Sequence, residues 1–232
     1  YWETKYGNGL IGLALDPKFA SNRFVYFYYT PISDTPKQYV SRFVLNDDNT
    51  LDLASEKVII EIPIDYEISR HTGGSLAFNS QTGDLFISTG DNTSPFASKG
   101  YTPIDERPER SLFDDQRSAS NTNDLRGKIL RIRPQPDGGY TVPEGNLFPP
   151  GTAGTRPEIY AMGCRNPYRI TVDAPTGALY WGEIGPDAGQ DGPQGPRGYD
   201  EFNQALRAGN FGWPYFIGNN IAYRDFNFET EA

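Results

Sequence analysis

Short runs of alternating apolar and polar residues recur along the chain, and three pairs of them share one layout. Each pair has an alternating run, a turn rich in Asp, Asn or Gly, and a second alternating run, and the pairs span residues 12–29, 75–88 and 169–182. Alternation with a period of two is typical of half-buried strands, and turns of this composition join antiparallel neighbours. The pattern therefore predicts three recurring β-hairpins.

Further strand-like runs lie between the hairpins, at 39–45, 57–62 and 128–132, and no long amphipathic helix is indicated. Each recurrence then carries about four short strands, and successive recurrences are separated by roughly 60 to 95 residues. A radial array of four-stranded blades, a β-propeller, explains best why the hairpin recurs. A β-sandwich is the alternative, but it gives no reason for the recurrence.

The number of repeats indicates an incomplete ring. Three repeats are visible in 232 residues, and 210–214 is the candidate start of a fourth. Propellers close with four to eight blades. We therefore predict an all-β chain that forms a single domain over 1–232 and supplies roughly three to four blades of a larger propeller.

One long segment, 92–126, is polar, and its apolar residues follow neither the period of two of a strand nor the 3.6-residue period of a helix. Long loops in compact domains are usually functional or disordered. We expect an ordered loop that borders the site, anchored by its apolar and aromatic residues Phe96, Tyr101, Leu112 and Phe113. A solvated charged loop is the alternative. The segment opens with 92–94, Asn-Thr-Ser, which fits an N-glycosylation acceptor and is also a frequent chance match.

The composition is aromatic, rich in turn-forming residues and acidic. Aromatic residues make up 14%, Gly and Pro number 25 and 19, and the net charge is −9 at pH 7. Nucleic acid is not an expected partner, because phosphate binding requires a basic face. No apolar run of about 18 residues is present, so no membrane span is predicted.

The single cysteine, Cys164, excludes an internal disulfide and a zinc site built from cysteines. Its small and apolar neighbours indicate a buried core residue rather than a nucleophile. The chain begins Tyr1-Trp2-Glu3, without an initiating Met or a signal-peptide pattern. We expect a mature piece or a fragment of a longer protein.

Residues that could take part in catalysis or in binding a ligand fall at corresponding positions of the second and third repeats. His71 precedes the second hairpin and Asp91 follows it, while Arg165-Asn166 precedes the third hairpin and Gly185-Pro186 follows it. Corresponding loops of a propeller converge on one axial face, so these groups are expected to share a pocket. His71 is the only histidine, and imidazole titrates near neutral pH, which suits a proton-accepting base.

Each of these residues also has a purely structural interpretation. His71 fits a hydrogen-bonded structural histidine, and Asp91 a turn residue that accepts from nearby backbone amides. Arg165 fits a surface ion pair, with Asn166 capping a turn. Gly185-Pro186 is an ordinary turn sequence. Residue types and positions leave both interpretations open.

Five segments together resemble the glucose/sorbosone dehydrogenase family: 9–17, 71–91, 125–132, 158–167 and 209–214. The resemblance runs through almost the whole chain and keeps the family's order of motifs. Members of this family are soluble sugar dehydrogenases that use pyrroloquinoline quinone (PQQ) and are built as six-bladed propellers. The resemblance therefore implies that fold, that type of activity and that cofactor.

The resemblance also implies roles for four side chains. His71 matches the general base that takes the hydroxyl proton of the sugar as hydride leaves its carbon for the quinone. Asp91 matches the carboxylate that orients this imidazole. Arg165 matches the arginine beside the quinone carbonyl, and Asn166 matches an amide that contacts the cofactor.

A calcium site is implied at Gly185 and Pro186, which match the pair whose backbone carbonyls ligate an ion that bridges to the quinone. The loop 185–198 is longer and richer in glycine than in the best-known soluble glucose dehydrogenases. In the family, the basic residues that hold the quinone's carboxylates come from later blades, which this chain does not supply. The chain is therefore expected to hold half of a cofactor site.

By the same resemblance, the substrate is an aldose that is oxidised to its lactone. A cytochrome c-type protein is the candidate electron acceptor, and the expected location is the periplasm or the outside of the cell. Two other classes stay open. A non-catalytic propeller would bind carbohydrate or protein without a cofactor. A calcium-dependent lactonase would need carboxylate and amide ligands at the axis, which Gly185-Pro186 fits poorly.

Overall fold

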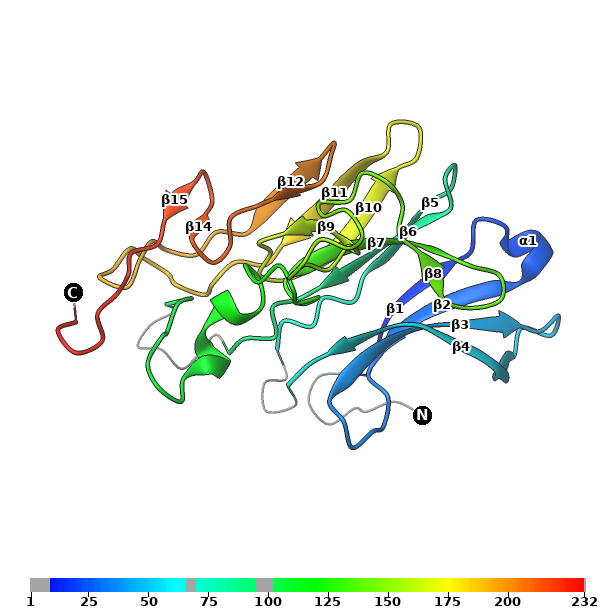
Figure 1. The fold of residues 1–232 in the computed structure, drawn as a ribbon, viewed down its shortest axis with the longest axis horizontal. Helices are drawn as coiled ribbons and strands as arrows, with labels where there is room; N and C mark the ends of the chain where they lie inside the picture. Colours follow the sequence, from blue (N-terminus) through cyan, green and yellow to red (C-terminus); the bar gives the residue numbers. More distant parts are fainter. Residues whose placement is uncertain (1–8, 66–69, 95–101, 232) are drawn as a thin grey trace.

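The computed structural model describes residues 9–65, 70–94 and 102–231, and in this part the chain is all-β. Three sheets follow one another along the chain, and each begins with one of the predicted hairpins (Figure 1). Helix is limited in the described residues to three short pieces, α1 (Phe19–Asn22), η1 (Ser111–Phe113) and η2 (Asp115–Arg117). The prediction of three hairpins in an all-β chain is confirmed.

The first sheet has the antiparallel strand order β1-β2-β3-β4. Its strands are β1 (Leu10–Leu15), β2 (Phe24–Tyr29), β3 (Lys37–Leu45) and β4 (Leu51–Pro63). Asp16 fixes the turn between β1 and β2, because its Oδ1 accepts the Lys18 backbone N–H at 2.8 Å and the Asn22 side-chain amide at 2.9 Å. A short polar side chain that bonds to the backbone two residues on is what favours Asp in such turns.

The second sheet contains the antiparallel series β5-β6-β7-β9, with β8 paired to β7 and β13 paired to β9. Its strands are β5 (Leu76–Asn79), β6 (Asp84–Thr89), β7 (Lys128–Pro134), β8 (Tyr140–Thr141), β9 (Ile159–Met162) and β13 (Gly209–Asn210).

Every residue of β6 is buried, so the expectation of a half-buried strand is wrong here. Leu85 and Ile87 pack into a cluster with Tyr28 of the first sheet. Phe86 points the other way and packs into a cluster with Trp181 of the third sheet. The alternation along β6 thus separates two cores, because a sheet covers each of its faces.

The third sheet has the antiparallel order β10-β11-β12, with β10 (Pro167–Asp173), β11 (Ala178–Glu183) and β12 (Glu201–Ala205). A two-stranded hairpin of β14 (Phe216–Ile217) and β15 (Ile221–Ala222) follows it. The segment 210–214 does not open a fourth repeat, because β13 pairs in parallel with β9 and returns to the second sheet. The Phe211 and Trp213 N–H groups continue this pairing by donating to Met162 and Gly163 carbonyls at 2.9 and 3.0 Å.

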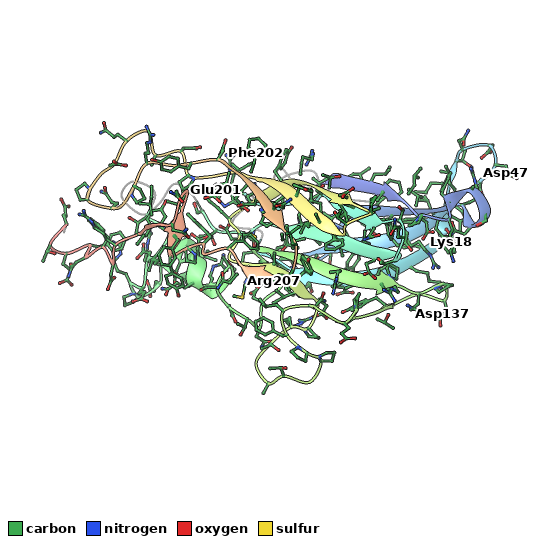
Figure 2. The ribbon with its side chains drawn as sticks, turned by 90° about the horizontal axis from the view of Figure 1, so that it is seen from above. Lys18, Asp47, Asp137, Glu201, Phe202 and Arg207 are labelled. Carbon is green, nitrogen blue, oxygen red and sulfur yellow. The ribbon has the colours of Figure 1, made fainter. Side chains whose placement is uncertain are left out.

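The first strands of the three sheets are neighbours, since β5 contacts β1 and β10. The turns after β1, β3 and β7 carry Lys18, Asp47 and Asp137, and they lie together at one end of the sheets (Figure 2). The chain enters β5 and leaves β6 at the opposite end. The positions of His71 and Asp91 therefore fall at that opposite end.

Both outer faces of the three-sheet stack expose apolar side chains. On β1, Leu13 and Leu15 are 56% and 49% exposed. On the third sheet, Tyr180 is 40% exposed and Phe202, on the outer side of β12, is 97% exposed (Figure 2). Sheets with an uncovered apolar face typically pack against a further layer.

Lys128 holds the described part of the long polar segment, 102–126, against the sheets. This lysine is fully buried, and its Nζ donates to the backbone carbonyls of Ser118, Ala119 and Arg126 at 2.7, 3.0 and 2.8 Å. A buried ammonium group that meets three carbonyl oxygens has all of its hydrogens satisfied. The segment is therefore tied down by polar contacts.

The apolar and aromatic side chains that were expected to anchor this segment are not deeply buried where the structure describes them. Leu112 and Phe113 are only half-buried, and Phe96 and Tyr101 lie outside the described residues. The match to a glycosylation acceptor at 92–94 fits a chance match, because the Asn92 side chain is 1% exposed and its Oδ1 accepts a backbone N–H at 2.6 Å. A sugar cannot be carried on a buried amide.

Replacing Lys128 with Met should destabilise the protein by about 2–4 kcal/mol, because three buried carbonyls lose their donor. Burial lowers the pKa of Lys128 from 10.5 to about 8, so the unfolded chain binds more protons between these pH values. The free energy of unfolding of the native protein should therefore rise with pH across this window, and the K128M variant should lack that rise. Urea unfolding at several pH values measures both effects.

The exposed Lys18 provides the matched control, since Lys18→Met removes an equal charge from a solvated turn. We expect this variant to unfold like the native protein. Native-like stability of K128M would contradict the structural role of the buried ammonium group.

Candidate active site

His71 lies in the loop before β5 and Asp91 after the end of β6, and their side chains are in contact. His71 Nδ1 is 2.8 Å from Asp91 Oδ1, and the two side chains are 10% and 0% exposed. Because a carboxylate only accepts hydrogen bonds, Nδ1 carries the proton and Nε2 is left as an acceptor. Within the described residues Nε2 has no hydrogen-bond partner.

The approach of these two loops depends on Gly90. A Cβ at this position would lie 1.8 Å from the His71 carbonyl oxygen, so only glycine fits. His71 itself has a φ of 50°, in the left-handed region that residues other than glycine rarely adopt. Strained backbone of this kind concentrates at functional sites.

Asp91 is the centre of a hydrogen-bond network. Besides His71, it accepts the Thr93 backbone N–H at 2.9 Å and the Trp213 Nε1–H at 3.2 Å. The carboxyl group of Asp115, from segment 102–126, acts on the pKa of Asp91. A buried carboxylate with several donors is held in one orientation, and it orients the imidazole in turn.

The pKa of His71 is lowered to about 3, chiefly by burial and next by the Arg165 guanidinium, while the acidic Asp115 and Asp187 oppose the shift. The imidazole is therefore neutral at physiological pH. A neutral ring whose Nδ1–H is held by a carboxylate can accept a proton only at Nε2.

Arg165 and Asn166 reach the same place from the loop between β9 and β10. The Arg165 carbonyl accepts the Asp91 backbone N–H at 2.8 Å, and Asn166 Oδ1 accepts the Gly73 N–H at 3.0 Å. The two residues are 5% and 8% exposed. The interpretation of Arg165 as part of a surface ion pair is wrong. The Arg165 side chain is buried, and it pairs with no carboxylate of the described residues.

The Arg165 guanidinium contacts the loop after β11. Its Nη1 donates to the Ile184 and Gly185 carbonyls, both at 2.9 Å. The Pro186 carbonyl oxygen packs against Gly198, where a Cβ would come within 1.5 Å of it. The structure thus brings Gly185 and Pro186 next to Arg165, and Arg165 next to the His71–Asp91 pair.

Glu183 supports this loop from the end of β11. Its Oε1 accepts the Asn166 backbone N–H at 2.6 Å and its Oε2 accepts the Trp181 Nε1–H at 2.8 Å. Burial raises the pKa of Glu183 to about 7. The Glu183 carboxyl group therefore fixes the backbone of Asn166 through this hydrogen bond.

Three residues of this cluster were missed at the level of the sequence: Trp213, Asp115 and Glu183. Trp213 lies in one of the segments that carry the family resemblance, so that resemblance could have pointed to it. Nothing in the sequence marks Asp115 or Glu183, because their roles depend on what the fold places beside them.

The polar groups of the cluster fit the oxygen-rich edge of a quinone. Within the described residues, Arg165 Nε and Nη2 and Asn166 Nδ2 make no hydrogen bond, so they keep donors to offer. The Tyr223 hydroxyl is buried without a partner in that part of the chain, and Arg165 acts on its pKa. Unsatisfied buried groups beside a free guanidinium edge indicate a ligand that carries acceptors.

For calcium the candidate donors are the carbonyl oxygens of Gly185 and Pro186. Gly185 O already accepts from Arg165, which leaves its second lone pair. Among the described residues, no group of three or more His, Cys, Asp or Glu side chains could hold a metal ion. These hard oxygen donors fit calcium as part of a coordination sphere that other ligands complete.

The hollow beside Arg165 is small. It is lined also by Gly185, Pro186 and Trp213, and its volume is about 20 Å³. This is room for a water molecule.

The fold and the cluster define an all-β protein with a buried imidazole–carboxylate site, and the comparisons name its family. Residues 3–231 match the family described as Glucose / Sorbosone dehydrogenase, and the chain belongs to this family. It is 29% identical over 208 residues to aldose sugar dehydrogenase YliI of Escherichia coli (strain K12), covering 89% of this chain and 46% of that protein. It is 26% identical over 238 residues to quinoprotein glucose dehydrogenase B of Acinetobacter calcoaceticus, covering 97% and 44%.

Solved structures agree with this assignment. A crystal structure of glucose dehydrogenase matches with a TM-score of 0.64 at 30% identity, over 90% of this chain and 50% of that one. The PQQ-bound form of aldose sugar dehydrogenase from Streptomyces coelicolor matches with a TM-score of 0.63 at 26% identity, over 93% and 52%. The resemblance stated from the sequence is thereby confirmed. The chain spans about half the length of the curated relatives it matches.

A search of the described residues for a helix of sufficient length and apolar character to cross a membrane finds none.

Proposed function

We propose that the protein to which this chain belongs is a quinoprotein sugar dehydrogenase, which oxidises an aldose to its lactone with PQQ and calcium. One observation carries the proposal: a buried imidazole, 2.8 Å from the Asp91 carboxylate, lies close enough to Arg165 for that cation to lower its pKa. Membership in the family supports it. So does the similarity to a quinoprotein glucose dehydrogenase and to a PQQ-bound aldose sugar dehydrogenase.

In this proposal His71 moves the proton. Its Nε2 accepts the hydrogen of the hydroxyl on the anomeric carbon, while its Nδ1–H stays bonded to Asp91, whose charge stabilises the imidazolium. Removing this proton makes the sugar oxygen alkoxide-like, which allows a hydride to leave the carbon. PQQ, when bound, supplies the acceptor for that hydride.

Arg165 and Asn166 have binding and electrostatic roles. The Arg165 guanidinium is a fixed cation, so it stabilises negative charge that develops on an oxygen placed at its free edge. The Asn166 side-chain amide accepts from Gly73 through Oδ1, its backbone N–H is held by Glu183, and its Nδ2–H is available to the cofactor. Hydrogen bonds within the protein already orient both side chains, which lowers the entropic cost of binding.

Calcium binding should depend on the cofactor, because Gly185 and Pro186 supply only two ligands and one is shared with Arg165. We expect the full-length apoprotein to bind calcium only at about millimolar concentration, and at least about tenfold more tightly once PQQ adds its oxygens. Calorimetry with and without PQQ measures this, with magnesium as the control ion. Equal calcium affinity in both states would contradict the assignment.

We also propose that further blades cover the two outer apolar faces and complete a six-bladed propeller. Leu13 and Leu15 on one face and Tyr180 and Phe202 on the other are exposed as they would be at the open ends of a ring. The relatives are about twice as long as this chain, which supports this architecture.

The proposed function is tested by reconstituting the full-length protein with PQQ and calcium and measuring dye reduction with a panel of aldoses. We expect reduction that requires sugar, PQQ and calcium together. Its absence across the panel would contradict the proposal, and carbohydrate binding without a cofactor would favour a non-catalytic module. A cytochrome c-type acceptor and a periplasmic or secreted location belong to the same proposal.

A further inference from the structure

A groove lies between the first and second sheets, at the end opposite the candidate active site. Its walls come from β2 and β3 and from the turns that follow β1, β5 and β7, and its volume is about 410 Å³. Lys18, which Figure 2 places at that end of the sheets, is one of the lining residues. Both sheets that form the groove belong to this chain, so the groove differs from the outer faces that further blades are proposed to cover.

Positive charge predominates among the side chains of the groove. Lys18, Arg42 and Arg133 line it, and Asp16 is the one lining carboxylate among the described residues. Asp16 is already engaged, because its Oδ1 accepts from the Lys18 backbone N–H and the Asn22 side chain at 2.8 and 2.9 Å. On a chain whose net charge is −9, the groove is therefore a local positive region that attracts anions.

One of the three cations is compensated within the protein, since Arg133 Nε donates to Asp84 Oδ1 at 2.8 Å. The other two are not compensated. Lys18 is exposed, and its ammonium group forms no ion pair with the described residues. Arg42 pairs with no carboxylate in that part of the chain either. The charge available to a ligand therefore belongs to Lys18 and Arg42.

The Arg42 guanidinium is the buried charge of the groove. Arg42 is 5% exposed, and its Cζ lies 4.0 Å from the centre of the Phe24 ring. Its Nη1 donates to the Gln135 and Pro136 carbonyls at 3.1 and 2.9 Å. A buried cation that lacks a counter-charge has lost its hydration without gaining a partner ion, so an anion placed beside it is stabilised.

The second edge of this guanidinium has no anionic partner. Nε is buried without a hydrogen-bond partner, and Nη2 reaches no carboxylate or backbone carbonyl in the described part of the chain. The nearby Tyr26 hydroxyl, on whose pKa Arg42 acts, donates to Asp16 at 3.4 Å. Nε and Nη2 form an edge that meets carboxylates and phosphates through two parallel N–H···O bonds. Because Nε is covered, this contact requires a small rotation of the guanidinium toward the groove.

The other lining groups suit a small molecule with several polar atoms. Ser80, Gln81 and Thr82, in the turn between β5 and β6, carry hydroxyl and amide groups, while Phe24 and Phe78 provide apolar wall. The volume of about 410 Å³ lies within the range of small-molecule sites. The groove therefore combines an anion-binding group with the polar and apolar surface that would hold the rest of such a molecule.

We propose that this groove is a second ligand site, which binds a small molecule through a carboxylate or phosphate group held by Arg42 and by Lys18 at the rim. The site lies apart from the candidate active site. It does not depend on the proposed function, because binding there requires neither a cofactor nor turnover.

Isothermal titration calorimetry of the full-length apoprotein at low ionic strength tests the site with inorganic phosphate, gluconate and glucose. Phosphate and gluconate carry the two kinds of anionic group, and glucose is a neutral molecule of similar size to gluconate. We expect at least one of the anions to bind with a dissociation constant of about 1 mM or tighter. The anion that binds more tightly identifies the group that the site recognises. Binding of neither anion would overturn the proposal.

Four variants locate the bound anion. Arg42→Met should weaken its binding at least about tenfold, and Arg42→Lys, which keeps the charge and loses the planar fork, should weaken it less. Lys18→Met should weaken it about two- to fivefold, as expected for an exposed charge. Arg169→Met removes an equal charge from an exposed position on the third sheet and is the matched control, so it should bind as the native protein does.

The result does not depend on one fragile variant. Arg42→Met removes the donor to two carbonyls, so its fold is checked by circular dichroism, whereas Lys18→Met changes only a solvated side chain. Native affinity in both Lys18→Met and Arg42→Lys would overturn the proposal. So would loss of anion binding in Arg165→Met alone, because the anion would then occupy the candidate active site. A protein that binds the anion in the groove but oxidises no sugar would contradict only the proposed function.

Discussion

Replacing His71 with Asn should lower kcat of the reconstituted protein by about 10²- to 10⁴-fold while leaving the fold intact. The Asn side chain places an N–H near the position of Nδ1, so it can still donate to the buried Asp91 carboxylate, which lies 2.8 Å from Nδ1 in the native protein. It has no group that can accept a proton at the position of Nε2. The variant therefore removes the base and keeps the hydrogen bond that holds Asp91.

His71→Ala is the comparison variant, since it removes both the base and the donor to Asp91. Its kcat should fall as far, but its free energy of unfolding should also fall by about 1–3 kcal/mol, because a buried carboxylate loses a partner. Steady-state kinetics and urea unfolding of both variants separate the two effects. A His71→Asn variant that retains native kcat would remove the imidazole from the proposed reaction.

The pH dependence of kcat/KM follows from the same residue. The base must be neutral to act, and the pKa of His71 is lowered to about 3, so the active form persists far below the ordinary histidine pKa of 6.5. The profile should therefore be flat with respect to His71 from pH 8 down to about pH 5. A single acid limb near the ordinary value would mean that the imidazole is solvated in the working protein.

Replacing Arg165 with Met should lower kcat by about 10²- to 10³-fold, because a fixed cation no longer stabilises charge that develops on oxygen. It should also lower the free energy of unfolding by about 1–3 kcal/mol, since the Ile184 and Gly185 carbonyls lose the donor that now lies 2.9 Å away. Arg165→Lys should recover only part of kcat. An ammonium group keeps the charge, but it does not have the planar fork that serves two carbonyls and a ligand together.

An independent readout of the Arg165 variant is the pKa of His71, measured by its ring signals in the apoprotein. The Arg165 cation lowers that pKa, so its removal should raise it. Arg169→Met is the matched control, because Arg169 lies on the same strand-and-loop unit but stacks on the exposed Tyr168 ring. An unchanged pKa of His71 in Arg165→Met would show that the two side chains are not electrostatically coupled in solution.

Part of the site could be predicted from the sequence because it depends on one hairpin. His71 and Asp91 are twenty residues apart, and the alternation of 75–88 predicts that the chain turns back between them. Two strands joined by a tight turn bring their outer ends together, whatever the rest of the protein does. The same local logic at 169–182 places Arg165 and Gly185 at one end of their hairpin.

The rest of the site could not be predicted, because it joins residues that no local pattern connects. Trp213 donates to Asp91 across 122 positions of sequence, and it does so only because β13 returns to β9. Asp115 lies in a segment without periodicity, and Lys128 sets its position through carbonyls of that segment. Such contacts are products of packing, and neither residue carries a signal of its own.

The sequence by itself determined the all-β class, the three hairpins and the shared end at which the reactive residues emerge, because a period of two and turn chemistry act over a few neighbouring residues. The tertiary structure decided that both faces of β6 are buried, that 210–214 joins the second sheet, and that Trp213 donates a hydrogen bond to Asp91. Burial and charge are summed over every group that the fold brings near. The protonation state of His71 and Asp91 is therefore a property of the assembled site.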